Sequence, residues 1–353
     1  MFKLEQRPVP SRWLSMGSPF IALLITVVIG SVMFAWLGKD PVDGLRMFFW
    51  EPIKSAYAWS ELSVKATPLI LIALGLAVCF RANLWNIGAE GQFVLGAICG
   101  GGVAMQATPE SSHGLVVGVL LAGALGGAAW AGVVAWLRQQ FNTNEILVSL
   151  MLVYVAEMLL SYLVYGPWKD PQGYNFPQTI TFLEAARVPK LVPGFRAHIG
   201  LVMAVVAVLG FTVFLFRTFA GFQLQVGGLA PSAARYAGFS SSRALWTAML
   251  LSGAMAGLAG ALDVAGPQGQ LTPYVPMGYG FAAIIVAFVG RLNPLGIVFS
   301  AVLMSMFYIG GELAQSRLGL PKAMTGIFQG VLLFALLACD TFIHQRLRWV
   351  SRT

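Results

Sequence analysis

The stretch N-I-G-A-E-G-Q, residues Asn86–Gln92, places two amides and a carboxylate between two apolar runs. Gly88 and Gly91 interrupt a helix that the flanking residues would continue. Non-helical backbone at membrane depth is tolerated only inside protein or beside a wet cavity, and broken helices in transporters present polar groups to the solute. One interpretation is a solute pathway lined by four side chains of this region: Trp85, Asn86, Glu90 and Gln92.

A plain cytoplasmic turn is the alternative interpretation of this motif. Glu90 would then cap the helix that follows it by interacting with the helix dipole. On the residues alone, the two interpretations carry equal weight.

Two further carboxylates, Glu157 and Asp263, lie within apolar segments, where burial of a charge is costly and often marks a functional site. Structural roles compete with proton or solute chemistry at both positions, because Asp263 is near a helix end and Glu157 can pair with a neighbouring helix. The 3 His and 3 Cys have no spacing typical of a metal site. We therefore predict no metal site and no catalytic residue.

The polar connection Gly221–Phe239 contains the string P-S-A-A-R-Y-A-G. Pro231 is typical of the first turn of a helix, and Gly238 of the residue that follows its end. A short helix between two membrane spans has no lipid against which to bury Ala and Tyr, so we predict a protein partner. Arg235 would suit an acidic rim on that partner.

Another polar string, N-T-N-E at Asn142–Glu145, precedes an apolar segment. An Asn at the cap position with an acid in the first turn is a standard helix start. A structural role is therefore favoured for Asn144 and Glu145 when the residues alone are considered.

Membrane-spanning helices must position these residues. Of 353 residues, 58% are hydrophobic and 10% are charged, so the chain cannot cover a soluble surface. A hydrocarbon core of about 30 Å needs about 20 apolar residues as helix. On that scale we identify ten segments: 19–37, 62–80, 90–107, 113–137, 145–165, 198–216, 244–264, 278–290, 294–311 and 321–339. The predicted fold is an all-α, polytopic transmembrane helical bundle, which excludes a soluble enzyme, a disordered chain and a free nucleic-acid binder.

Small residues four positions apart predict close packing among these helices, because such pairs let backbones approach each other in lipid. The pairs are Gly96 and Gly100, Gly114 and Gly118, Gly123 and Gly127, and Gly253 and Gly257.

Basic residues predict the orientation, because Lys and Arg are retained on the cytoplasmic side. With the N-terminus inside, the inner loops and the two ends of the chain hold twelve Lys and Arg against four acids. The short outer loops, 108–112 and 265–277, hold no Lys or Arg. Both termini are thus predicted to be cytoplasmic, and the net charge of +8 mainly records this orientation.

Three strings in this order resemble one protein family. They are N-I-G-A-E-G-Q at Asn86–Gln92, A-A-R-Y-A-G at Ala233–Gly238, and G-Y-G-F-A-A-I-I-V-A-F-V-G-R-L-N-P-L-G at Gly278–Gly296. Stretches at Asn144–Leu152 and Pro321–Gly330 agree with it. From about residue 60 to 340, the chain is similar to the permease subunits of ATP-binding-cassette (ABC) importers of the nucleoside and simple-sugar type. These belong to the branched-chain amino acid/ribose permease superfamily.

The resemblance implies partners for the chain. They are a second permease subunit in a hetero-dimer, a cytoplasmic ABC ATPase that carries ATP, and an external substrate-binding lipoprotein or receptor. The loop 217–243 would supply the coupling helix that contacts the ATPase, through Pro231, Ala234, Arg235, Tyr236 and Gly238. Relatives often have Arg and Asn where this chain has Gln225 and Ala230.

The resemblance also assigns the site and the organisation of the chain. It favours the pathway interpretation of the first motif and adds Asn144 and Glu145 to the pathway candidates. The expected organisation is a cytoplasmic N-terminal segment (1–18), a transmembrane permease domain (19–340) and a cytoplasmic tail (341–353), as a multi-pass protein of the plasma or inner membrane.

The function implied is translocation of a small polar solute, with a nucleoside or purine-like compound expected first. Trp85, Tyr154 and Tyr279 would let a base stack. The chain has no phosphate-binding G-x-x-x-x-G-K-[ST] loop, so we expect no enzymatic activity and no cofactor of its own.

Three alternatives remain at this point. One is a permease of the same family for a sugar or a branched-chain amino acid. Another is a proton-coupled secondary transporter that uses Glu157 or Asp263. The third is a structural or signalling membrane subunit.

Overall fold

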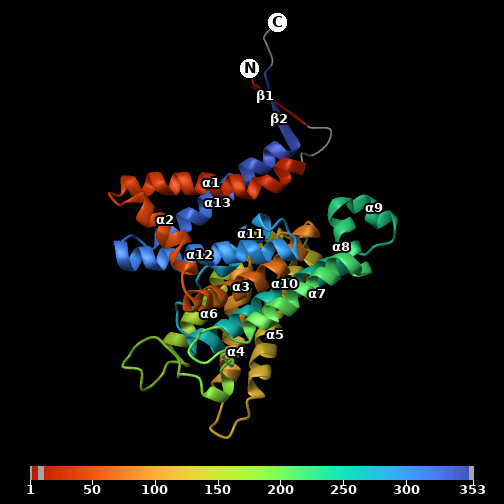
Figure 1. The fold of residues 1–353 in the computed structure, drawn as a ribbon. Coiled ribbons are helices and arrows are strands. Elements are labelled where there is room, and N and C mark those ends of the chain that lie inside the picture. Colours follow the sequence, from red (N-terminus) through yellow and green to blue (C-terminus); the bar gives the residue numbers. More distant parts are fainter. Residues whose placement is uncertain (1, 7–11, 350–353) are drawn as a thin grey trace. The chain divides into compact units, whose positions relative to one another are not determined.

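The computed structural model describes residues 2–6 and 12–349, with side-chain surroundings for residues 17–339 (Figure 1). The α-helices are α1 (Arg12–Trp36), α2 (Pro41–Phe49), α3 (Ala56–Arg81), α4 (Ala89–Ala104), α5 (Leu115–Phe141), α6 (Glu145–Tyr165), α7 (Gly200–Arg217), α8 (Phe219–Leu229), α9 (Pro231–Tyr236), α10 (Ser241–Asp263), α11 (Tyr279–Val289), α12 (Pro294–Leu318) and α13 (Ala323–His344). Shorter helical turns are η1 (Glu51–Ile53), η2 (Glu184–Ala186) and the π-helical η3 (Val264–Gln268). Parts of the predicted terminal segments 1–18 and 341–353 lie outside the described residues.

The predicted all-α membrane bundle is confirmed, since each of the ten predicted segments coincides with one helix. In the described part of the chain, seven helices are long and apolar enough to cross a membrane: Gly17–Trp36, Ala56–Arg81, Leu115–Phe141, Glu145–Tyr165, Gly200–Arg217, Ser241–Gln268 and Pro294–Leu318. The other three predicted segments correspond to α4, α11 and α13. A short antiparallel pair of strands, β1 (Phe2–Gln6) and β2 (Gln345–Trp349), joins the two ends of the chain.

The chain divides into two compact units, and α3 and α12 each pass from one unit into the other. The first unit comprises Met1–Leu62 and Leu303–Thr353. Its described core is aromatic: the rings of Phe48 and Phe328 stack with centroids 4.4 Å apart, and Phe34 and Phe307 pack around them.

The second unit, Ser63–Val302, is built on α4, α5 and α10, which pack against one another. Three of the four predicted glycine pairs lie at this junction. A Cβ atom at Gly127 would come within 2.6 Å of the Gly257 Cα atom, and one at Gly123 within 3.0 Å of the Gly257 carbonyl oxygen. A Cβ atom at Gly118 would meet no atom closer than 3.9 Å. Close backbone approach therefore explains three pairs, and the pair that contains Gly118 has no such contact.

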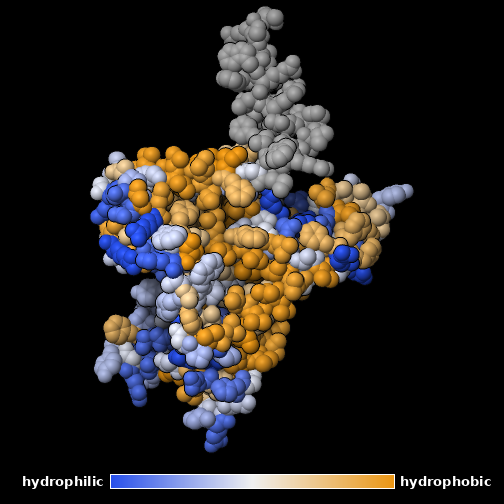
Figure 2. All heavy atoms as spheres, viewed as in Figure 1, coloured by the Kyte–Doolittle hydropathy of each residue, from blue (hydrophilic) through white to orange (hydrophobic). Residues whose placement is uncertain are grey.

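The outer helices of the second unit carry large apolar side chains on their exposed faces. On α7, Val205, Val206 and Leu209 are all more than half exposed. Figure 2 shows apolar residues covering the surface over α5 and α7, as lipid contact requires. Polar surface gathers instead over the connection between α4 and α5.

Candidate functional site

The predicted break between α3 and α4 is confirmed. Helix α3 ends at Arg81, Asn83 adopts a left-handed conformation (φ 54°), and the Leu84 N–H donates to the Cys79 carbonyl (2.9 Å). The chain is then non-helical until α4 begins at Ala89. Trp85 and Asn86 therefore start from irregular backbone, and Gly88 lies directly before α4, as predicted. Gly91 does not interrupt the helix: it lies in the first turn of α4, together with Glu90.

The break reaches into the depth of the bundle. A Cβ atom at Gly88 would lie 2.7 Å from the Ser149 carbonyl oxygen, and one at Gly91 would lie 2.9 Å from the Val153 Cα atom. These partners lie about 6 Å and 12 Å along α6 from its first residue, Glu145, at a rise of about 1.5 Å per residue. α4 itself has 16 residues, fewer than the about 20 that a full span needs.

Asn86 and Gln92 form a reciprocal amide pair inside the protein. The Asn86 Nδ2 atom donates to Gln92 Oε1, and Gln92 Nε2 donates to Asn86 Oδ1, both at 3.0 Å. Asn86 also donates to Ser252 Oγ on α10 (2.9 Å) and accepts from the Gly88 N–H (3.2 Å). Asn86, Gln92 and Ser252 are at most 1% exposed. In this conformation the two amides bond to each other and join the irregular segment before α4 to the first turn of α4.

Glu90 caps a different helix from the one it belongs to. Its carboxylate accepts a hydrogen bond from the Gly278 N–H (2.8 Å) and another from the Gly280 N–H, at the start of α11. The backbone of Gly278 has a left-handed conformation (φ 76°), which residues other than glycine rarely adopt. The N-terminus of a helix has free N–H groups and a partial positive charge. The carboxylate accepts hydrogen bonds from these N–H groups, and its negative charge interacts favourably with the helix dipole. The carboxylate therefore joins α4 to α11, with the side chain 1% exposed.

Trp85 lies at the exposed edge of the break. Its ring is 5.4 Å from that of Phe80 and 6.1 Å from that of Phe288 on α11, and the residue is 39% exposed. The Trp85 N–H donates to Glu145 Oε1 (3.4 Å). Of the four predicted pathway residues of this motif, Trp85 alone is exposed in the described structure.

Asn144 and Glu145 are placed at the same end of the second unit. Asn144 Oδ1 accepts from the Ile146 N–H (2.9 Å), so the predicted helix start is confirmed. Glu145 forms an ion pair with Arg138, at the end of α5. Ser149 donates its hydroxyl to the Ile146 carbonyl and accepts from the Ile87 N–H (3.3 Å). Glu145 and Ser149 thus tie α6 to the break.

The short helix predicted at Pro231–Tyr236 is present as α9. Gly238 ends it in a left-handed conformation (φ 79°), and the Phe239 N–H donates to the Ala234 carbonyl (2.9 Å). Tyr236 is 96% exposed.

Two features of this connection were not predicted. Residues Phe219–Leu229 form a helix of their own, α8, whose last residue, Leu229, is 86% exposed. Ala234 is 5% exposed and faces inward, whereas Pro231, Arg235 and Gly238 are exposed.

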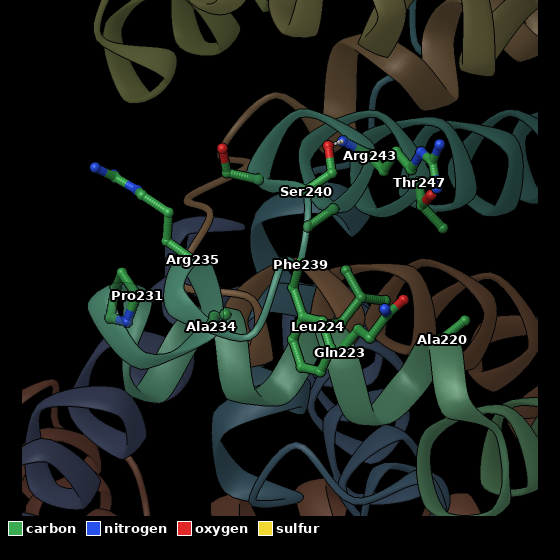
Figure 3. A pocket seen from close by; sticks show the side chains of 14 residues that line it. Ala220, Gln223, Leu224, Pro231, Ala234, Arg235, Phe239, Ser240, Arg243 and Thr247 are labelled. Atoms are coloured by element: carbon green, nitrogen blue, oxygen red, sulfur yellow. Dashed lines mark hydrogen bonds between the residues drawn. The ribbon is translucent and has the colours of Figure 1, made fainter.

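A small cavity of about 150 Å³ lies between α8, α9 and the start of α10. Ala234, Phe239 and Leu224 line its apolar side, and Figure 3 shows Arg235 directed away from them. The Phe239 ring packs on α8, 5.8 Å from that of Phe219. α8 and α9 therefore form one packed element, with Pro231, Arg235 and Tyr236 on its exposed side.

The two remaining carboxylates of the apolar segments differ in their surroundings. Asp263 is 6% exposed, accepts a hydrogen bond from Gln268, and lies within electrostatic range of Lys65 and Arg196. Glu157 is half-buried on α6. Among the described residues, no group of His, Cys, Asp and Glu could hold a metal ion.

A second cavity, of about 520 Å³, lies near the start of α7 and the end of α10, and basic side chains line it. Arg187, Lys190 and Arg196 line it together with one acid, Glu184. The buried Arg187 Nε atom has no hydrogen-bond partner among the described residues. The wall is fixed by main-chain hydrogen bonds, including one from Val188 N–H to the Ala265 carbonyl (2.9 Å).

His198, 4% exposed, forms part of the same wall. Its Nδ1 atom accepts from the Gly200 N–H (3.1 Å), which places the remaining ring proton on Nε2. Burial, and then the charge of Arg196, lower the pKa of His198 from 6.5 to about 4, so the ring is neutral at pH 7.

Comparison with known proteins gives a consistent result. The glucose ABC transporter permease protein TsgB13 of Haloferax volcanii is 36% identical, over 98% of this chain and 93% of its own length. The nucleoside ABC transporter permease protein NupB of Lactococcus lactis is 27% identical, over 90% and 89%. The guanosine ABC transporter permease protein NupP of Bacillus subtilis is 28% identical, over 89% and 91%. The family model described as "Branched-chain amino acid transport system / permease component" matches residues 59–337, and the chain belongs to this family of membrane-embedded ABC transporter permeases.

Proposed function

We propose that this chain forms the translocation pathway of an ABC importer for a small polar solute that contains a sugar ring. The observation that carries the proposal is the position of α8 and α9. Gly228, at the end of α8, packs against the Arg81–Ala82 backbone where α3 breaks, and α9 presents Tyr236 beyond it. The proposed binding helix α9 therefore follows directly after α8, and α8 contacts the irregular backbone beside the predicted pathway.

The partner proposed for α9 is a cytoplasmic ABC ATPase. Leu229 and Tyr236 expose large apolar surfaces next to Arg235, and buried apolar or aromatic anchors with charged neighbours are typical of binding hot spots. ATP would be bound and hydrolysed on that partner, because the sequence has no phosphate-binding loop.

The remaining partners are a second permease subunit and an external receptor. The basic cavity around Arg187, Lys190 and Arg196 lies on the side that the charge rule assigns to the outside. Its excess of positive charge favours a receptor that presents acidic side chains.

A nucleoside is the first candidate for the solute, and a free sugar is the second. Relatives named for nucleosides and for guanosine support the first, and the relative named for glucose supports the second. Trp85 and Tyr154 are partly exposed, although the Trp85 ring already stacks on that of Phe288, whereas Tyr279 is 1% exposed. Binding of guanosine, adenosine, ribose and glucose to the purified receptor, measured by calorimetry, distinguishes them: glucose binding without nucleoside binding would select the sugar.

Reconstitution tests the function as a whole. The chain, its ATPase and its second permease are placed in liposomes with the receptor outside and ATP inside. We expect solute uptake that needs ATP and all four proteins. Uptake by this chain alone, driven by a proton gradient, would instead support a secondary transporter and overturn the proposal.

The ATPase contact is tested with Tyr236→Ala and Arg235→Glu. Each is expected to weaken ATPase association at least about tenfold, the effect of losing a moderate hot spot, and to leave receptor binding unchanged. Tyr174→Ala is a matched control, because Tyr174 is 93% exposed on the connection between α6 and α7. Normal association of the Tyr236→Ala and Arg235→Glu variants would exclude α9 as the contact.

A further inference from the structure

The guanidinium group of Arg81, the last residue of α3, connects three other segments of the second unit. Its Nε atom donates to the Leu292 carbonyl (2.9 Å), and its NH1 atom donates to Gln225 Oε1 (2.7 Å). The charge lies over the Phe216 ring, 5.1 Å from the centroid. Arg81 therefore makes hydrogen bonds to the turn after α11 and to α8, and a cation–π contact with the end of α7.

Both hydrogen-bond partners are held in place by their own surroundings. Gln225 Nε2 donates to the Leu215 carbonyl (2.7 Å), which directs its oxygen toward Arg81. Arg291 and Leu292 both have φ of 54°, a left-handed turn that sets the direction of the Leu292 carbonyl. The two acceptors thus lie along two different edges of one planar guanidinium group.

Helix α8 also touches the same point through its backbone. A Cβ atom at Gly228 would lie 3.0 Å from the Ala82 Cα atom and closer still to the Arg81 carbonyl oxygen. Since α9 follows α8 after one residue, Ala230, a displacement of α9 reaches the Arg81–Ala82 backbone and the Gln225 bond together.

Helix α11 is consequently held at both ends by residues that flank the break. Glu90 binds the N–H groups at its start, and Arg81 binds the carbonyl just beyond its end. The helix between them is 11 residues long and mostly buried. Because both of its ends are bound in this way, α11 can move together with the end of α3 and the start of α4 as a rigid body.

We propose that Arg81 is a positioning residue that transmits movement of α8 and α9 to α11 and the α3–α4 break. The proposal rests on the function proposed above, because it assumes that a partner moves α9. Arg81 acts through Gln225 on one side and through Leu292 on the other, and it contacts no solute. Lysine cannot replace it, since an ammonium group does not present two donors along fixed, separate directions.

The primary test is Arg81→Lys in the full assembly of two permeases, ATPase and receptor. Assembly and basal ATP hydrolysis are expected to stay within about twofold of wild type. Uptake, and stimulation of ATP hydrolysis by loaded receptor, are expected to fall at least about tenfold, as for a lost hydrogen bond to a charged group. Arg217→Lys is the control, because Arg217 is exposed at the end of α7 and its side chain makes no hydrogen bond or ion pair with the described residues.

A matched pair at Gln225 covers the case in which Arg81→Lys does not assemble. Gln225→Glu and Gln225→Met both lose the bond to the Leu215 carbonyl, but only Gln225→Glu keeps an acceptor for Arg81. Gln225→Glu is expected to retain receptor-stimulated hydrolysis and uptake, and Gln225→Met to lose both by at least about tenfold.

The outcomes separate this inference from the proposed function. Wild-type liposomes that show no ATP-dependent uptake would refute the proposed function. If the wild type transports, equal uptake by the two Gln225 variants overturns the role of Arg81. So does wild-type uptake in an Arg81→Lys assembly that forms normally. Where Arg81→Lys fails to assemble, the two Gln225 variants decide.

Discussion

The Glu90 carboxylate and the Gly278 N–H are joined by a 2.8 Å hydrogen bond, so an acid in the first turn of α4 caps the start of α11. The residues lie far apart in the sequence. Their contact fixes how deep the short helix α11 begins, because α11 cannot slide without leaving its N–H groups unpaired in a dry interior.

Removal of this carboxylate should destabilise the second unit. Glu90→Ala leaves the Gly278 and Gly280 N–H groups without their acceptor, at a cost of about 3 kcal/mol in the free energy of unfolding. Glu90→Gln keeps one acceptor oxygen and should lose less. Thermal unfolding in lipid nanodiscs measures both, with Glu110→Ala in the exposed connection between α4 and α5 as the control.

Uptake by the same variants separates capping from a pathway role. If Glu90 also contributes to solute passage, Glu90→Ala should impair uptake more than it impairs assembly. Uptake that stays unchanged in Glu90→Ala would restrict the residue to capping.

The reciprocal amide pair makes a second prediction. Gln92→Leu removes one hydrogen-bond partner from Asn86 Nδ2 and one from Asn86 Oδ1 in a buried site. This should lower the free energy of unfolding by about 1–3 kcal/mol. The double variant with Asn86→Leu should cost less than the sum of the two single variants, because the second change removes groups already unpaired. Thermal unfolding of all four proteins gives the coupling energy. Strict additivity would show that the pair does not act as a unit, and Gln106→Leu on the exposed connection after α4 controls for surface hydrophobicity.

The glycine junction makes a third prediction. Gly257→Ala places a Cβ atom 2.8 Å from the Gly127 Cα atom and still closer to the Gly123 carbonyl, so α5 and α10 must separate. We expect a loss of about 1–3 kcal/mol or more, as for an overpacked core. Gly118→Ala on α5 should be neutral, since its nearest neighbour would be 3.9 Å away. Equal unfolding temperatures for the two variants would contradict the close contact.

Local signals in the sequence account for much of this fold and for the limits of its elements. Gly88 predicts the break, Asn144 predicts the start of α6, and Pro231 with Gly238 predicts α9, whereas Gly91 lies inside α4 and breaks nothing. Each of these is decided by neighbours within a few residues, through caps and positive-φ positions.

The contacts of the site could not be read in this way, because they join distant segments. Nothing near Glu90 indicates that Gly278 is its partner, and nothing near Arg81 indicates Gln225 or Leu292. Helix α8 was missed because its Gly-rich sequence has low helix propensity, and packing of α7 and α10 against it compensates. Ser252, which completes the amide network, carries no sequence signal of its own.

A fourth prediction concerns pH and the wall of the basic cavity. Burial and Arg196 lower the pKa of His198 to about 4, while an unfolded histidine titrates near 6.5. Below pH 6.5 the unfolded chain gains a proton that the folded chain does not, so the stability present above pH 6.5 is lost as the pH falls toward 4.

The unfolding temperature of the wild type should therefore drop between pH 7.5 and 5 by an amount that His198→Asn largely removes. Asparagine fits this test because its Oδ1 atom can accept from the Gly200 N–H as His198 Nδ1 does, and it does not titrate. His113→Asn is the matched control, an exposed histidine that lines the same cavity. If His198→Asn keeps the full pH dependence, another group is responsible. If instead the dependence disappears in that variant and persists in the control, protonation of this one buried ring limits the acid stability of the wall of the basic cavity.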